Sequence, residues 1–116
     1  RNEMAKVTAL EKDAFKMNRK LMLEENIQWA FCRETGVTII YKVMPKGNFV
    51  KLSVAYCNPQ DRFKKKIGLN TAMLRWCNDM AIQIPACWPA LGNPQDTIQS
   101  FADIIRFDEC NLKFVG

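Results

Sequence analysis

Two stretches in the middle of the chain have the hydrophobic pattern of β-strands. Val37–Met44 is rich in β-branched residues, and Phe49–Tyr56 alternates apolar and polar positions with a period of two. Turn-forming residues at 45–48 separate them. In the second stretch we expect Ser53 to face outward. The residues expected to face the core are Val50, Leu52, Val54 and Tyr56.

A third apolar stretch precedes these two and fits more than one structure. Ile27, Trp29 and Phe31 alternate with other residues, which favours a strand, although the stretch also fits a helix that continues to Gly36. We favour the strand because residues 34–36 then form a hairpin turn in which Gly36 can adopt a positive φ. The three strands would form an antiparallel meander.

Helix-start signals and helical spacing predict a helix on each side of this meander. Thr8 and Glu11 form a capping box, so one helix should run from there to about Glu25. Residues 58–61, Asn-Pro-Gln-Asp, offer a cap, a proline at the first helical position and an early carboxylate, so a second helix should start there. The apolar faces expected to pack on the core are Leu10, Ala14, Met17 and Leu21 in the first helix, and Phe63, Ile67, Asn70, Leu74, Cys77 and Ala81 in the second, widened by Met73, Trp76 and Met80.

The C-terminal third begins with an apolar, proline-rich connector at residues 83–93. Residues 93–96 then repeat the Asn-Pro-Gln-Asp sequence, and apolar residues follow at helical spacing, which predicts a short third helix. Residues 112–115 fit an edge strand. The predicted fold class is therefore α+β: a three-stranded antiparallel meander with helices packed on one face (α-β-β-β-α), plus a C-terminal helical extension.

The length of 116 residues corresponds to one domain, which we assign to residues 4–116. Met4-Ala5-Lys6 resembles a translation start, so residues 1–3 are expected to be an expression remnant outside the domain. We see neither a signal-peptide pattern nor an apolar run of the roughly 18 residues that a membrane span needs. We therefore expect no membrane partner.

The absence of histidine and the placement of cysteine limit the chemistry that we expect. Without histidine there is no Ser-His or Cys-His nucleophile pair, and a catalytic zinc site is disfavoured. The five cysteines are widely spaced and include no CxxC, which indicates a reducing cytoplasm. We expect a non-enzymatic protein with no catalytic residues, no metal and no cofactor.

The formal charge of +5 is unevenly distributed. Residues 1–75 hold 15 Lys and Arg against 7 Asp and Glu, and residues 76–116 hold 2 against 5, which gives +8 and −3. The basic part predicts a polyanionic or acidic partner, although solubility alone can also account for such a charge.

A basic cluster at the predicted start of the second helix is the main candidate site. Cations at a helix N-terminus oppose the helix dipole at a cost of about 0.3–1 kcal/mol each, whereas a bound phosphate would use both the cations and the free amides. The alternative is a solvated face that tolerates the repulsion. The candidate nucleic-acid-binding residues are Arg62, Lys64, Lys65 and Lys66, extended by Arg75, Lys16, Arg19 and Lys20.

The three tryptophans provide an alternative site. Trp29 and Trp76 fit core packing, although either could also stack on bases. Trp88, together with Leu91 in the connector, could anchor a protein partner. The alternative function is therefore a protein-binding module, with the acidic C-terminal part contributing, and a homodimer is possible.

Two stretches resemble known families. The order of helix, three antiparallel strands and helix across residues 8–82 resembles the double-stranded-RNA-binding domain, in which lysines at the second helix hold phosphates, as 64–66 would here. Residues 55–68 resemble a stretch found in small phage and prophage proteins. The resemblances imply a phage-type accessory protein in the host cytoplasm that binds the phosphate backbone of nucleic acid or inhibits a host factor.

Overall fold

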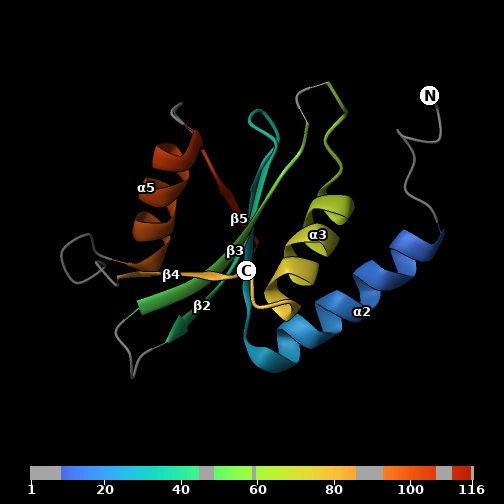
Figure 1. Cartoon of the computed structure of the whole chain (residues 1–116), viewed down its shortest axis with the longest axis horizontal. Helices are drawn as coiled ribbons and strands as arrows, with labels where there is room; N and C mark the ends of the chain where they lie inside the picture. Colours follow the sequence, from blue (N-terminus) through green and yellow to red (C-terminus); the bar gives the residue numbers. More distant parts are fainter. Residues whose placement is uncertain (1–8, 45–48, 59, 86–92, 107–110, 116) are drawn as a thin grey trace.

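The computed structural model describes residues 9–44, 49–58, 60–85, 93–106 and 111–115, with only the backbone described at 104–106 (Figure 1). A five-stranded sheet separates one helix from the other two. The α+β class is thus confirmed. The elements are α2 (Ala9–Glu25), β1 (Gln28–Cys32), β2 (Val37–Met44), β3 (Phe49–Tyr56), α3 (Lys65–Cys77), β4 (Ile82–Pro85), α5 (Pro94–Arg106) and β5 (Lys113–Val115).

The sheet has the order β4-β3-β2-β1-β5, and every neighbouring pair is antiparallel. Its centre is the predicted meander, with β2 and β3 at their predicted bounds, and β1 confirms the strand interpretation of residues 27–32. Gly36 has a φ of 71° in the β1–β2 turn, as the hairpin requires. The strand predicted near 112–115 pairs with β1 as β5.

Both faces of the sheet are covered by helices, and each face has its own apolar cluster. The predicted helices α2 and α3 lie together on one face, whereas the C-terminal helix α5 covers the opposite face (Figure 1). Alternate residues of the same strand therefore serve different cores: Ile39 belongs to the α5 side and Ile40 to the α2/α3 side. Neither face of the meander is left as an open sheet surface.

The connector predicted at 83–93 is partly wrong. Ile82–Pro85 forms strand β4, which pairs with β3 over residues 49–52. The period-two alternation of Ile82 and Ile84 was present in the sequence, but Pro85 suggested a loop. A proline is compatible with this position because it ends an edge strand. Residues 86–92 lie outside the described residues.

The predicted apolar face of α2 is wrong. Leu10 and Met17 are 80% and 73% exposed, and Leu21 is also exposed. The helix instead packs through Phe15, Asn18 and Met22, which follow one another at helical spacing. Asn18 belongs to this face because its side-chain amide donates a hydrogen bond to the Asn70 Oδ1 of α3 at 2.8 Å. Because Asn18 is polar, the hydrophobic pattern of α2 assigned this packed face to solvent.

The second predicted helix begins later than expected, and its packed face matches the predicted one only in part, at residues such as Asn70 and Met73. α3 starts at Lys65, and its buried residues are Leu69, Ala72 and Met73. Leu74, expected in the core, is 62% exposed. Cys77 and Met80, also expected in the core, are exposed, whereas Phe63 and Trp76 are partly buried against the α2/α3 side of the core.

Gly68 sets how α3 sits on the sheet. A Cβ at this position would meet the Thr38 Oγ1 of β2 closer than non-bonded atoms approach, and the Thr38 Cβ at 3.2 Å. Only glycine therefore permits this close approach of helix to strand. Beside it, the Ser53 hydroxyl donates to the Ala72 carbonyl at 2.7 Å, so Ser53 is buried rather than outward-facing. Tyr56, expected in the core, is 47% exposed.

Within the described part of the chain, none of the helices combines the length and the apolar character that a membrane crossing requires.

Candidate nucleic-acid interface

The segment between β3 and α3 folds back on itself before the helix begins. The Asn58 Oδ1 accepts from the Gln60 amide at 3.0 Å, and the Asn58 carbonyl accepts from the Asp61 amide at 2.9 Å. At the start of the segment, the Cys57 amide donates to the Gly36 carbonyl at 2.7 Å. These bonds make a turn that carries the following basic residues past the β1–β2 hairpin.

The N-terminus of α3 is basic and has no side-chain cap. Lys64 occupies the N-cap position in an extended conformation, with φ −128° and ψ 113°, and its side chain makes no cap hydrogen bond. Lys65 and Lys66 follow, and the first turn contains no acidic residue. The helix dipole therefore meets positive charge at its positive end, which an anion would relieve.

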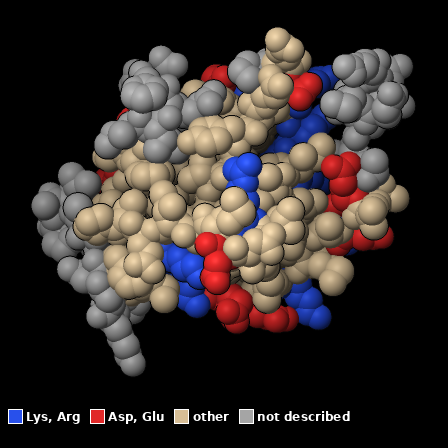
Figure 2. All heavy atoms as spheres, in the orientation of Figure 1, with Lys and Arg blue, Asp and Glu red and all other residues tan. Residues whose placement is uncertain are grey.

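Six basic side chains line one shallow groove at this end of the molecule. The groove also contains Phe63, and no carboxylate lines it among the described residues. Figure 2 shows blue side chains gathered at the upper right, near the place where α3 starts in Figure 1, with red side chains beside them. The basic residues, which come from α2, the β1–β2 turn and the start of α3, are Lys12, Arg33, Arg62, Lys64, Lys65 and Lys66.

Aromatic rings hold this groove in place. Phe63 stacks on Phe31 with ring centroids 6.0 Å apart and planes 21° apart. The Arg33 guanidinium lies 5.6 Å from the centroid of each of these rings. The Lys66 amine lies 5.4 Å from the ring centroid of Phe15 on α2. Two of the cations are thus positioned by contacts with aromatic rings.

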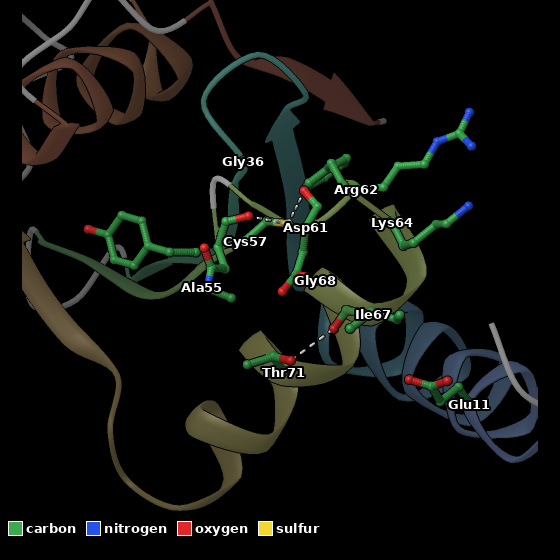
Figure 3. A pocket seen from close by; sticks show the side chains of 13 residues that line it. Glu11, Gly36, Ala55, Cys57, Asp61, Arg62, Lys64, Ile67, Gly68 and Thr71 are labelled. Atoms are coloured by element: carbon green, nitrogen blue, oxygen red, sulfur yellow. Dashed lines mark hydrogen bonds between the residues drawn. The ribbon is translucent and has the colours of Figure 1, made fainter. Parts of the chain in front are cut away.

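A deeper pocket of about 340 Å³ adjoins the groove and shares Arg62, Phe63 and Lys64 with it. Figure 3 shows Arg62 and Lys64 extending to the same side, away from the inner wall that Gly68 and Thr71 form. The pocket differs from the groove in charge, because two carboxylates line it. The other lining residues are Glu11, Gly36, Ala55, Tyr56, Cys57, Asn58, Asp61 and Ile67.

Two ionisable groups beside this pocket have altered pKa values. Burial raises the pKa of the Cys57 thiol, and the nearby negative charge of Asp61 raises it further. The Cys57 Sγ is 3.6 Å from the Asp61 carbonyl oxygen. The pKa of Glu34 is lowered by a hydrogen bond from the Cys32 thiol at 3.2 Å, and then by a backbone amide. A raised pKa lowers the fraction of Cys57 present as thiolate, which is the nucleophilic form.

The structure brings together the central candidates but not the extended set. Arg62, Lys64, Lys65 and Lys66 all line the groove. Arg75 does not line it, because its guanidinium donates to the Val54 carbonyl at 2.6 Å.

The α2 residues of the extended set also lie off the groove. Arg19 lies 5.2 Å above the Trp29 ring. Lys16 and Lys20 are exposed on α2 and are not lining residues. Trp29 is buried, which confirms its core role, and Trp88 and Leu91 lie outside the described residues.

Sequence reasoning missed Lys12, Arg33 and the central position of Phe63. Lys12 is one helical turn before Lys16, and the α2 face that packs on α3 decides which of these two lysines reaches the groove. Arg33 belongs to the hairpin turn, next to the end of β1. Arg33 follows Phe31 by two residues, so the two side chains can lie on the same side of the chain. This spacing was a sequence signal that the Arg33 guanidinium could contact the Phe31 ring.

Comparisons of the chain with protein-family models, with curated proteins and with solved structures gave no match. Among the described residues, no group of three or more metal-ligating side chains could hold a metal ion.

Proposed function

We propose that this protein is a non-enzymatic module that binds the phosphate backbone of nucleic acid, without base specificity, through the groove at the start of α3. The observation that carries the proposal is the composition of that groove: six cations from three segments, with no carboxylate among the described residues that line it. Backbone contacts of this kind give affinity that is largely independent of sequence.

The electrostatics of α3 add to this argument. Lys64, Lys65 and Lys66 lie where the free amides of the first turn also point outward. A phosphate oxygen there would accept hydrogen bonds from amides and from ammonium groups, and it would cancel the repulsion between the cations and the helix dipole. Each phosphate neutralised should steepen the logarithmic salt dependence by about 0.9 on duplex DNA, or about 0.7 on a single strand.

The resemblance of residues 55–68 to phage proteins supports a finer proposal, that the module is a phage-type accessory protein acting in the host cytoplasm. The groove residues Arg62, Lys64, Lys65 and Lys66 fall within this stretch.

The test is a charge reversal with a matched control. K64E/K65E/K66E and K16E/K20E/K113E change the net charge equally, but only the first set lines the groove. We expect the first variant to lose affinity for a random duplex on the order of 100-fold at low salt and the control to lose little. Thermal unfolding checks that both remain folded. Equal losses in both variants, or none in either, would reject the groove as the site.

A protein-binding module is the second candidate, and one observation favours it. Leu10, Met17 and Leu21 form an exposed apolar row along α2, with Leu74 and Met80 exposed on and just after α3. Such a row suits an apolar partner, a host protein or a second copy of the chain. Recovery of one stoichiometric protein from nuclease-treated bacterial lysate would favour this candidate over nucleic-acid binding.

A further inference from the structure

The pocket beside the basic groove differs from it in shape as well as in charge. Its volume is about 340 Å³, and small residues make part of its wall at Gly36, Ala55 and Gly68. The glycines cannot easily be enlarged, because a Cβ at Gly36 would lie 3.0 Å from the Cys57 Cβ and one at Gly68 would collide with Thr38. Close packing against Cys57 and Thr38 therefore keeps these two wall positions small.

Charge divides the pocket from the groove. Glu11 and Asp61 line the pocket, whereas the described lining of the groove includes cations and no carboxylate. Arg62 and Lys64 also line the pocket and balance its two carboxylates, so a phosphate group should be attracted more strongly to the groove than to the pocket. The pocket instead offers carboxylate, amide and hydroxyl oxygens, which suit a planar group that carries N–H donors.

Phe63 lies at the junction of the two sites. It lines the pocket and the groove, and also a third hollow beside the 33–36 turn. Phe63 is partly buried, and its stacking on the buried Phe31 fixes the orientation of its ring. An aromatic ring held beside a line of cations is the arrangement on which proteins stack the bases of single-stranded nucleic acids.

We propose that the pocket receives one unpaired base, stacked on Phe63, of a single-stranded nucleic acid whose neighbouring phosphates lie on Arg62, Lys64 and Lys65. This inference rests on the proposed function, because the groove must hold the backbone for the base to reach the pocket. In a duplex the bases are paired and stacked on one another, so they cannot enter. The pocket therefore selects single-stranded nucleic acid, whereas the groove can also hold the phosphate backbone of a duplex.

The test compares three probes with four variants by fluorescence anisotropy on the full chain. The probes are a labelled 12-nucleotide single strand of mixed sequence, the same sequence as a duplex, and inorganic tripolyphosphate as a competitor. The variants are F63L, F63Y, K64E/K65E/K66E and the control F114L. F114L removes a partly buried ring that packs on Tyr41, in the α5 face of the sheet.

We expect the single strand to bind more tightly than the duplex. F63L should weaken single-strand binding about 10-fold, within the range that base stacking contributes, and F63Y should restore it because the ring is retained. F63L should weaken duplex and tripolyphosphate binding much less than single-strand binding, because it leaves the groove cations in place, and F114L should leave all three affinities unchanged.

Two failures are distinguishable. If the lysine variant loses binding, while the duplex binds as tightly as the single strand and F63L behaves like F114L, the base pocket is rejected and the backbone site stands. If the wild-type chain binds no probe, both proposals fail. If the melting curve shows that F63L does not fold, the wild type and F63Y decide instead. In both of these proteins the affinity for the single strand should exceed the affinity for the duplex, and equal affinities would reject the base pocket.

An independent readout comes from a cysteine in the pocket. Cys57 lines the pocket, whereas Cys77 is exposed on α3. Excess single strand should slow alkylation of Cys57 at least about 5-fold, as judged by peptide mapping, and should leave Cys77 unchanged. We expect tripolyphosphate to bind in the groove and not in the pocket, so it should not protect Cys57. Protection by tripolyphosphate equal to that by the single strand would contradict a base in the pocket.

Discussion

The sequence Asn-Pro-Gln-Asp occurs twice in this chain and has two different outcomes. At 93–96 it starts α5: the Asn93 Oδ1 accepts from the Asp96 amide at 3.0 Å, and Asp96 supplies an acid in the first turn. At 58–61 the asparagine Oδ1 accepts from Gln60 instead, and the helix begins only at Lys65. The same four residues cap a helix in one place and form a turn in the other.

The difference lies in the residues on the C-terminal side of each tetrapeptide. After 93–96, Thr97 and Ile98 are buried at once, so the local signal and the core agree on where α5 begins. After 58–61, Phe63 packs on Phe31 and Gly68 must contact Thr38, which places the helix later. A capping sequence therefore starts a helix only where the packing of the next turn agrees with it.

The two helix starts also differ in charge. The N-terminus of α5 has a side-chain cap and an acid in its first turn, whereas that of α3 has neither and carries Lys64, Lys65 and Lys66. At the N-terminus of α5, a local side chain accepts a hydrogen bond from a free backbone amide. At the N-terminus of α3, only packing against the sheet determines where the helix begins. The groove that we propose for phosphate lies at the terminus that the chain itself leaves unsatisfied.

The largest expected effect comes from breaking the packing that fixes α3. Gly68→Ala should destabilise the fold by about 2 kcal/mol, because the clash with Thr38 outweighs the gain in helix propensity of about 1 kcal/mol. Chemical denaturation measures this. The double variant G68A/T38A should recover most of the loss, and a single variant as stable as wild type would show that packing does not set this helix.

Removing the cap of α5 should have the next largest effect. Asn93→Ala deletes the acceptor for the Asp96 amide and should cost about 1 kcal/mol. Asn58→Ala is the matched control: it deletes a hydrogen bond in an exposed turn and should cost only a few tenths. Equal losses of unfolding free energy in the two variants would mean that the tetrapeptides act alike after all.

Giving α3 the cap that α5 has should separate stability from binding. Lys64 already has the extended conformation of an N-cap, so Lys64→Asn should stabilise the fold by about 0.5–1 kcal/mol. The same change removes a cation from the groove and should weaken nucleic-acid binding. Denaturation and anisotropy on one sample check both. A variant that gains stability and affinity together would contradict an uncapped anion site.

The smallest effect is expected at Lys12, which reaches the groove from α2. Lys12→Gln should change stability by less than about 0.5 kcal/mol, because this exposed side chain has no structural role in the described contacts. It should still weaken binding, and Lys16→Gln, one turn further along the same helix, should not. If the two variants bind nucleic acid with identical affinities, α2 does not contribute to the interface.

The extent to which the sequence predicted the fold differed between strands and helices. β2 and β3 were predicted at their observed bounds because a β-branched run and a period-two alternation are both strand signals, and turn-forming residues separate the two stretches. The face of α2 was wrong because this helix meets α3 through Asn18, which hydropathy assigns to solvent, whereas Asn70 was predicted on the packed face of α3 and does lie there. Asn70 also donates to the Glu11 carbonyl at 3.0 Å, so a polar seam joins the helices.

The sequence predicted the central residues of the candidate site but not the residues that border it. The run from Arg62 to Lys66 is contiguous, so the sequence alone shows it. Lys12 and Arg33 join it only through the packing of α2 and the position of the hairpin. Arg75 was included by helical proximity, and its hydrogen bond to the Val54 carbonyl could not be foreseen from spacing.

The salt dependence of binding tests the central claim most directly. The affinity for a single strand should be measured between about 50 and 200 mM salt for the wild type, K64N, K12Q and the control K16Q/K20Q. We predict that the logarithmic slope falls by about 0.7 for each groove cation removed and stays unchanged in the control. A slope that changes equally in the control and groove variants, or in neither, would contradict a phosphate site at the start of α3.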